Sequence, residues 1–211
     1  VGSIHDVSTE EESRTQLTQM QRLDSLTRLS NRGFFQETIE SYLQNIDERQ
    51  QQLSIVMIDL NRFKRINESI GHSAGDEVLR TVAQRLENGA AQAMKASDRK
   101  LTIKVARLGG DEFAVVVLRV GQDDALLPVD VSTAVDHLLA ELARTAFYAG
   151  DTPLWITGSA GIALHPRNGR DYSTLLKKAD AALRHAKSSS GEVDFYRDDM
   201  RLTPSFYLKT E

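Results

Sequence analysis

Two adjacent carboxylates, Asp111 and Glu112, follow a pair of glycines in a segment that could bind a cation or another polar partner. Apolar runs rich in β-branched residues flank this segment, and such runs around a short glycine-bearing turn predict a β-hairpin. Successive strand residues point to opposite faces of a sheet, so one carboxylate should face a partner near the strand tip. Gly110 would let a backbone or a phosphate approach closely. An ordinary solvated hairpin turn stays open as the alternative.

A third carboxylate, Asp59, stands at the end of an apolar run at residues 53–60. Apolar residues at successive positions indicate a central strand that is covered on both faces. An unpaired charge at the end of such a strand is costly to bury, and a bound cation would remove that cost. Asp59 is therefore a candidate metal ligand, with a purely structural aspartate as the alternative.

The connection at residues 61–76 contains two glycines, two asparagines, a histidine and several basic residues. This composition suits the wall of a pocket better than a plain linker. Asp76 can accept hydrogen bonds from the ring N–H and exocyclic amine of guanine, and Asn67 can donate one to a ring acceptor. Both side chains are therefore candidates for binding a guanine base.

Hydrophobic periodicity indicates which elements would position these residues. In chain order we expect a helix at 32–50 capped by Ser30 or Asn31, a strand at 53–60, a helix that includes 78–86, an irregular polar connection at 87–103, the hairpin, a helix at 128–147, a strand at 154–163, a helix at 172–189 and an edge strand at 193–196. Helices and strands that alternate around one hairpin predict an α/β sandwich, a mixed central sheet flanked by helices.

The N-terminal residues predict a separate amphipathic helix. Hydroxyl and acidic residues at 8–12 are typical of a helix start. Leu17, Met20, Leu23 and Leu26 then form a narrow apolar seam. This seam could pair with a second copy in a coiled coil or dock on its own domain, and the sequence leaves both open.

The composition bounds the class of protein. A chain of 211 residues with 40% hydrophobic and 27% charged residues is typical of one globular domain. Its formal net charge of −4 gives no general attraction to nucleic acid or anionic membranes, so we expect neither as a partner and any phosphate site must be local. The absence of cysteine excludes disulfides and thiol catalysis and fits the cytoplasm. No signal-peptide pattern or membrane-spanning run is found.

The segment at residues 109–113 resembles the signature of the GGDEF family, the diguanylate cyclases that make cyclic di-GMP from two GTP. Residues 24–32 and 59–76 resemble two further motifs of that family, in its order and spacing, and residues 179–187 resemble a fourth. The resemblance implies a ferredoxin-like nucleotidyl-cyclase palm. It also implies an N-terminal linker and signalling helix at 1–23, a GGDEF domain at 24–196 and a C-terminal linker at 197–211.

The resemblance also implies roles for individual residues. The implied ligands of Mg²⁺ or Mn²⁺ are Asp59, the backbone of Leu60, Asp111 and Glu112. The implied catalytic residues are Asp111, Glu112 and Lys64. The implied GTP-binding residues are Phe63, Lys64, Asn67, His72, Asp76, Arg107 and Lys187. One such site holds one GTP, so the family's chemistry requires a homodimer.

The chain departs from the family's pattern at several positions. Gly33 and Arg184 replace an arginine and a tyrosine, and Asn61 replaces the second aspartate of the strand-end motif. Residues 188–192 replace a phosphate-binding Lys-x-x-Gly-Arg-Asn segment. Residues 100–103 lack the aspartate of the family's inhibitory Arg-x-x-Asp, so we expect no product inhibition there.

These departures leave a second function open, a GTP-binding regulatory module that controls a neighbouring domain without turnover. A scaffold that binds no nucleotide is disfavoured, because the candidate metal and guanine residues are present. Residues 6–10 resemble the exit of PAS sensor domains, and residues 195–200 resemble the linker into EAL phosphodiesterase domains. We therefore expect this chain to be part of a longer PAS–GGDEF–EAL signalling protein.

Overall fold

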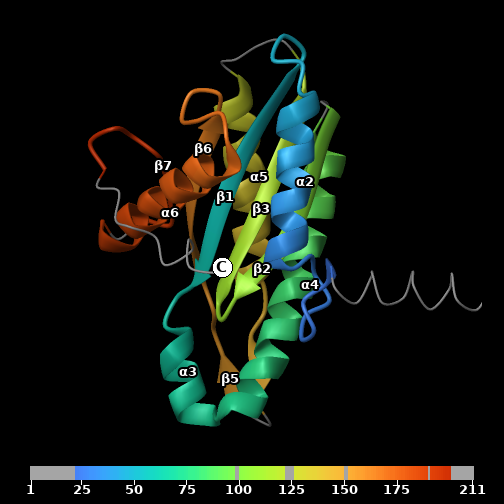
Figure 1. Ribbon diagram of the computed structural model, residues 1–211. Helices are drawn as coiled ribbons and strands as arrows, with labels where there is room; N and C mark the ends of the chain where they lie inside the picture. The colour runs from blue at the N-terminus through green and yellow to red at the C-terminus, as the bar shows by residue number, and fades with distance from the viewer. Residues whose placement is uncertain (1–21, 98–99, 122–125, 150–151, 190, 201–211) are drawn as a thin grey trace, which may run out of the picture.

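The computed structural model describes residues 22–97, 100–121, 126–149, 152–189 and 191–200 (Figure 1). The elements are α2 (Arg32–Asn45), β1 (Gln51–Leu60), α3 (Phe63–Ile70), α4 (His72–Ala96), β2 (Lys100–Gly109), β3 (Glu112–Val120), α5 (Leu126–Ala143), β4 (Phe147–Ala149), β5 (Thr152–Leu154), β6 (Gly158–His165), α6 (Tyr172–Ser188) and β7 (Val193–Phe195).

Five strands form one mixed sheet in the order β2-β3-β1-β6-β7. Strand β1 is antiparallel to both β3 and β6, and β7 runs parallel to β6. The order of β1, β2, β3 and β6, with helices between them, is that of a ferredoxin-like βαββαβ core. The predicted hairpin is confirmed as β2 and β3, and β4 pairs with β5 in a separate two-stranded sheet.

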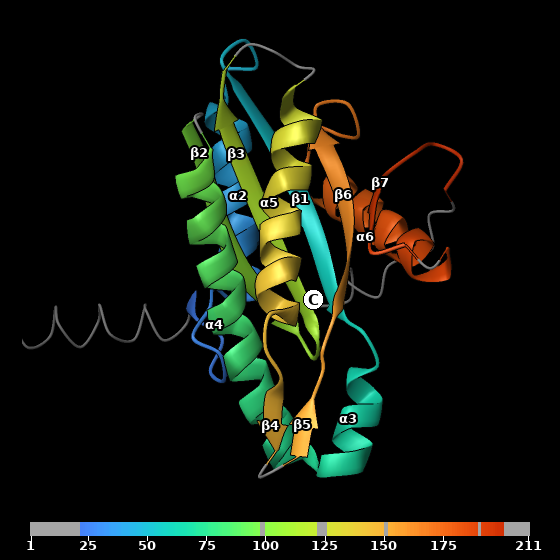
Figure 2. The same ribbon diagram turned by 180° about the vertical axis from the view of Figure 1, so that it is seen from behind.

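Helices cover both faces of the sheet. Figure 1 shows α2 and α6 in front of it, and Figure 2 shows α4 and α5 over the opposite face. Leu53, Ile55 and Met57 of β1 pack with α2 and α6, while Val56 and Ile58 pack with α4 and α5. The prediction of a central strand buried on both faces is therefore confirmed, as is the α/β sandwich.

The end of β1 and the turn of the β2–β3 hairpin lie at the same end of the sheet, because the two strands are antiparallel and Asp59 pairs with Glu112. Helix α3 and the β4–β5 hairpin lie beyond that end (Figure 1). This arrangement gathers the strand-end carboxylates and the polar 61–76 connection in one region.

The predicted N-cap of α2 is confirmed at Asn31, whose side chain accepts a hydrogen bond from the Phe34 amide at 2.9 Å. The helix ends at Asn45, earlier than the expected residue 50. The amides of Gln50 and Gln51 donate to the Asp47 carbonyl at 2.8 and 2.7 Å, so this segment forms a turn before β1.

The expected irregular connection at 87–103 is wrong. Helix α4 continues to Ala96, and β2 begins at Lys100. Gly89 stays helical because α5 packs tightly against it. A Cβ added at Gly89 would lie 2.8 Å from the Cα of Leu138.

Two further boundaries differ from the prediction. The expected helix at 128–147 spans Leu126–Ala143, and Phe147 belongs to β4. The single strand expected at 154–163 is two, because β5 ends at Leu154 and β6 begins at Gly158. Between them the Thr157 carbonyl accepts a hydrogen bond from the Asn61 amide at 2.8 Å.

Most of the expected N-terminal helix, including Leu17 and Met20, lies outside the described residues. Leu23 and Leu26 do not extend it, because Leu23 forms a β-bridge with Ser30 and Leu26 lies in a turn. No helix in the described part of the chain is long and apolar enough to span a membrane.

Candidate functional site

Four predicted metal-site residues lie together at one end of the sheet. Asp59 of β1 is directly opposite Glu112 of β3, and opposite residues of an antiparallel pair project from the same face. Asp111 lies in the turn before Glu112, and its carbonyl accepts a hydrogen bond from the Leu60 amide at 3.4 Å. The hairpin therefore brings its two carboxylates to the end of β1.

The Asp59 carboxylate is held where negative charge accumulates. Its side chain is only 20% exposed and contacts the Lys187 ammonium. Burial is the largest effect on the pKa of Asp59 and raises it, and the charges of Asp111 and Asp180 raise it further, whereas Lys187 opposes the shift. The net pKa of Asp59 is above its ordinary value, so this site favours a bound cation or proton.

The donor atoms at this point suit a divalent cation. Asp59 and Asp111 supply carboxylate oxygens and Leu60 a backbone carbonyl, all hard ligands. No group of three or more His, Cys, Asp or Glu within the described residues is arranged as a complete metal site. These donor atoms are of the type that Mg²⁺ prefers, and Mg²⁺ usually takes its remaining ligands from phosphates or water.

Glu112 faces α2 as well as the metal-site carboxylates. Its side chain is 31% exposed, and one of its carboxylate oxygens lies 4.0 Å from Arg32 Nη2. The Arg32 guanidinium also donates to the Leu108 carbonyl at 3.2 and 3.0 Å. Arg32 thus connects α2 to the hairpin beside Glu112, a contact that the sequence interpretation did not identify.

A cavity of about 330 Å³ adjoins the hairpin turn. It is lined by Phe63, Lys64, Asn67, Glu68, His72, Gly110 and Asp111, which include five of the predicted site residues. The Asn67 Oδ1 atom is buried and has no hydrogen-bond partner within the described residues. Gly75 makes room for it, since a Cβ there would lie 1.8 Å from that oxygen. A buried polar atom without a partner indicates a place for a polar ligand.

The other predicted residues are placed around this cavity. Lys64 is 89% exposed at its rim and lies 4.0 Å from Glu68. Asp76, on α4, is exposed and is not among the lining residues. Arg107 does not line the cavity either, but it donates to the Gly110 carbonyl and so supports the turn before Asp111.

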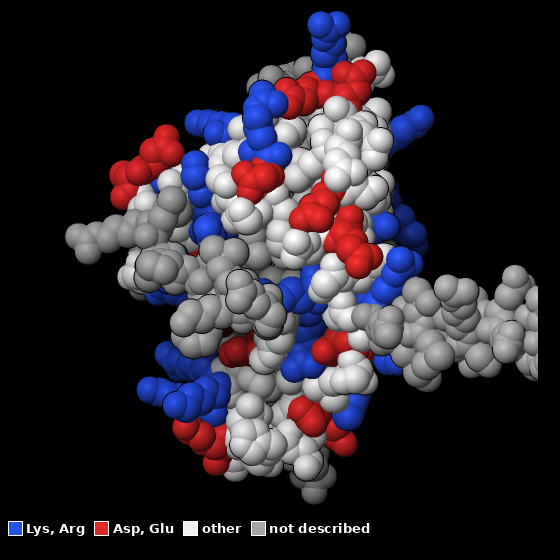
Figure 3. Space-filling view, in the orientation of Figure 1, with Lys and Arg blue, Asp and Glu red and all other residues white. Residues whose placement is uncertain are grey.

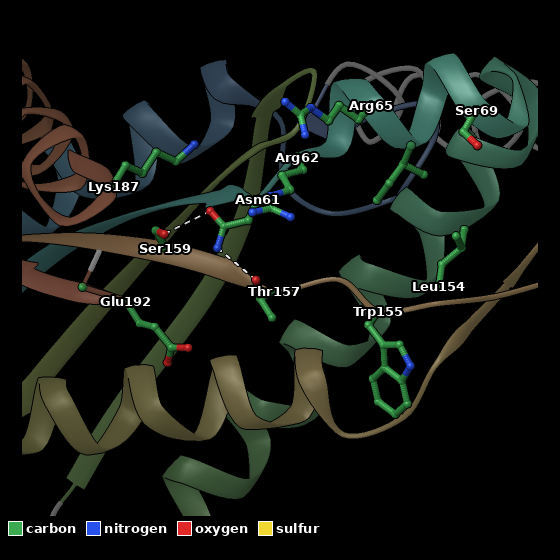
Figure 4. Close-up of a pocket in the computed structure, with 12 residues that line it drawn as sticks. Asn61, Arg62, Arg65, Ser69, Leu154, Trp155, Thr157, Ser159, Lys187 and Glu192 are labelled. Carbon is green, nitrogen blue, oxygen red and sulfur yellow. Dashed lines mark hydrogen bonds between the residues drawn. The ribbon is translucent and has the colours of Figure 1, made fainter. Parts of the chain in front are cut away.

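A larger cavity of about 780 Å³ lies at the same end of the sheet (Figure 4). Of the predicted residues it contains Lys187, which also contacts Asp59. Asn61 lies in its floor, where its side-chain amide donates to Thr157 Oγ1 at 3.0 Å and accepts from Ser159 Oγ at 3.1 Å.

The sequence interpretation did not single out three other residues that line this cavity, Arg62, Arg65 and Trp155. The two arginines are three residues apart at a helix start, and residues with this spacing share a helix face. This spacing could have indicated that both arginines line one site.

The chain resembles known proteins in both sequence and fold. The sequence model of the family described as "Diguanylate cyclase, GGDEF domain" matches residues 21–192. Over 172 residues the chain is 35% identical to cyclic di-GMP phosphodiesterase NbdA of Pseudomonas aeruginosa, covering 82% of this chain and 20% of NbdA. Over 164 residues it is 35% identical to diguanylate cyclase TpbB of the same organism, covering 78% of this chain and 34% of TpbB.

A solved structure of a truncated TpbB that comprises only its GGDEF domain has the same fold. It superposes with a TM-score of 0.69 and 32% sequence identity, over 83% of this chain and 94% of that one. The present chain spans 20% of the length of NbdA and 34% of that of TpbB. The family match covers well over half of the sequence, and the chain belongs to the GGDEF domain family.

Proposed function

We propose that this domain is a diguanylate cyclase, which condenses two GTP into cyclic di-GMP and releases two pyrophosphates. The observation that carries the proposal is the position of Asp59 opposite Glu112, next to a cavity lined by Asn67 and Asp111. The carboxylates could hold the cation of a nucleoside triphosphate, and the buried amide could bind its base.

The guanine base would enter the smaller cavity. The Asn67 amide would pair with the base, and Asp76 would approach it from α4. Phe63 and His72 would form the walls. Removing either polar partner would leave a group unpaired, a loss of about 1–3 kcal/mol in binding.

The reaction would join the 3′-oxygen of one GTP to the α-phosphorus of the other. That bond forms while the bond from the α-phosphorus to the bridging oxygen of the β-phosphate breaks, and pyrophosphate leaves. Glu112 would accept the proton of the 3′-hydroxyl, with Asp111 and Lys64 beside the reacting phosphate. A second attack of the same kind, by the 3′-oxygen of the other nucleotide on the remaining α-phosphorus, closes the ring and releases the second pyrophosphate.

A divalent cation, Mg²⁺ or Mn²⁺, held by Asp59, the Leu60 carbonyl, Asp111 and Glu112 would supply positive charge to the triphosphate. Lys187 lies against Asp59 and would hold the outer phosphates. The resulting charge balance is that of phosphoryl-transfer sites in general, where positioning and electrostatics supply most of the catalysis.

Each chain carries one set of these residues, so the reaction would take place between two chains facing each other. We propose that residues 24–196 form the cyclase domain, between linkers at residues 1–23 and 197–211. Flanking PAS and EAL domains in a longer protein would place an input and an output on either side.

A GTP-binding regulatory module without turnover is the second candidate. Two observations favour it. The Asn61 amide is engaged by Ser159 and Thr157, and Glu192 lines the larger cavity in the segment where the family has an arginine. In that case the domain would bind GTP and act on a neighbouring domain.

One experiment separates the two candidates. The chain is incubated with GTP and Mg²⁺, nucleotide products are resolved by chromatography, and GTP affinity is measured by calorimetry. The control is the Asp111→Asn, Glu112→Gln variant, which keeps the size of both side chains. Cyclic di-GMP that disappears in the control supports the cyclase. Tight GTP binding without product at any chain concentration supports the regulatory module.

A further inference from the structure

The larger cavity contains two arginines that the proposed function leaves without a role. Arg62 and Arg65 both line it and both are exposed. Among the residues that the structure describes, neither guanidinium forms an ion pair or a side-chain hydrogen bond. Lys187, the third cation of this cavity, already contacts Asp59.

The backbone holds these arginines in a defined position. Arg62 precedes α3 with φ 61° and ψ 20°, a left-handed conformation that is unusual for a residue other than glycine. Such conformations cost on the order of 1–3 kcal/mol and are enriched at functional sites. The Arg62 carbonyl accepts the Arg65 amide at 2.9 Å, so the helix starts with both side chains on one face.

The rest of the cavity suits a polar, negatively charged ligand. In Figure 4, Asn61, Thr157 and Ser159 lie centrally, while Lys187 and Arg65 stand on one side and Trp155 and Glu192 on the other. In the space-filling view, basic side chains project from the end of the molecule that carries α3 (Figure 3).

The two cavities are linked through the carboxylates. Asp111 lines the smaller cavity, and Asp59 contacts Lys187 of the larger one. The reacting α-phosphate must lie near these carboxylates. A GTP whose base fills the smaller cavity would therefore direct its outer phosphates into the larger one.

We propose that Arg62 and Arg65 bind the β- and γ-phosphates of this GTP. The assignment rests on the proposed GTP site and adds the residues that hold the leaving group. Guanidinium groups form paired hydrogen bonds to phosphate oxygens, which a lysine cannot match. The negative charge of Glu192, across the cavity, repels the phosphates and so weakens GTP binding.

The experiment compares the affinities of GTP, GMP and guanosine for the wild type and for Arg62→Ala, Arg65→Ala. The control is Arg167→Ala, an exposed arginine just after His165, whose pairing with Leu53 puts it at the far end of β1. We expect GTP to bind about tenfold more weakly or worse, since hydrogen bonds to charged groups contribute about 1.5–3 kcal/mol each. GMP and guanosine should bind the double variant and the Arg167→Ala control as tightly as they bind the wild type.

Trp155 gives an independent signal. It is the only tryptophan in the chain, it is 68% exposed, and it lines the larger cavity. GTP should change its fluorescence emission more than GMP does, and the double variant should reduce that difference. Glu192→Gln should strengthen GTP binding and leave GMP binding unchanged.

Three results would overturn the assignment. One is unchanged GTP affinity in the double variant with normal product formation, which leaves the cyclase proposal intact. Another is an equal loss of GTP and GMP affinity in a variant whose thermal unfolding matches the wild type. A wild-type chain that binds no GTP would overturn both proposals. The milder change Arg65→Gln should also weaken GTP binding without weakening GMP binding, and the loss of GTP affinity should be smaller.

Discussion

The Arg107 guanidinium joins the Asp24 carboxylate to the turn that carries Asp111. Its Nη1 atom lies 3.0 Å from Asp24 Oδ1, and its Nε and Nη2 atoms donate to the Gly110 carbonyl at 3.1 and 2.8 Å. Asp24 also accepts from the amide and hydroxyl of Thr27 at 2.8 and 2.7 Å. The first described turn of the domain is thereby fixed to the hairpin of the candidate site.

Arg107→Ala should lower the free energy of unfolding by about 1–3 kcal/mol, because it leaves the partly buried Asp24 carboxylate without its cation. Arg107→Lys should lose less, since it keeps the charge but not the fork of donors. Urea denaturation measures both, with the exposed Arg80→Ala as a control. Equal stability of Arg107→Ala and the control would show that this link contributes nothing.

The chain should lose stability as the pH falls below about 6.5, the ordinary pKa of histidine. Burial is the main effect on the pKa of His165 and lowers it, Arg170 lowers it further, and Glu48, 3.7 Å away, opposes the shift. The unfolded chain then binds a proton that the folded chain does not, so acid favours unfolding. In His165→Gln the midpoint of urea denaturation should change less between pH 7 and pH 5 than it does in the wild type. If the midpoint of the variant depends on pH as strongly as that of the wild type, groups other than His165 cause the loss of stability.

A buried ion pair at the other end of the sheet should be sensitive to the loss of one partner. Arg119 Nε lies 2.7 Å from Asp130 Oδ2, with the two side chains 4% and 5% exposed, and Arg119 also donates to Gln52 at 2.7 Å. Asp130→Ala removes the buried carboxylate from this pair and leaves the buried guanidinium charge without that partner, which should cost about 3–5 kcal/mol. The double change Arg119→Met, Asp130→Leu should regain most of this loss in thermal unfolding. No recovery in the double variant would show that the loss does not come from burying the Arg119 charge without the Asp130 carboxylate.

Gly161→Ala should be severely destabilising, by more than about 3 kcal/mol. A Cβ at this position of β6 would lie 2.1 Å from the Leu183 amide and 2.2 Å from the Ala179 carbonyl, so α6 could not stay in place. Gly33→Ala is the matched control, because the nearest atom is 3.6 Å from its Cβ and alanine favours a helix by about 0.5–1 kcal/mol. Similar unfolding midpoints for the two variants would contradict the close packing of α6 on β6.

The sequence predicted those features that depend on local pattern. The apolar run before Asp59 became the central strand, the glycine-bearing segment before Asp111 became the hairpin turn, and Asn31 became a helix cap. Each follows from alternation, turn chemistry or capping within a few residues. The α6 stripe was also predictable, and its apolar residues Leu175, Leu176 and Leu183 are buried.

Features that depend on distant segments were missed. Gly89 looks like a helix break, yet α4 passes through it because α5 packs on that spot. The strands are interrupted between β5 and β6, where the Thr157 carbonyl accepts a hydrogen bond from the Asn61 backbone amide, a pairing across almost half of the chain. The larger cavity is lined by residues of this segment and by Arg62 and Arg65, and a local pattern in either segment does not show that the two meet.

The most direct test of the proposed cyclase is the rate of pyrophosphate release per chain at saturating GTP with Mg²⁺, followed over a wide range of chain concentration. In the proposed mechanism two chains must meet for each reaction, so this rate should rise with concentration and then level off. Cyclic di-GMP should form at half the amount of pyrophosphate, and Asp59→Asn should abolish both. A chain that binds GTP but releases no pyrophosphate at any concentration would contradict the proposal, as would a rate that Asp59→Asn leaves unchanged.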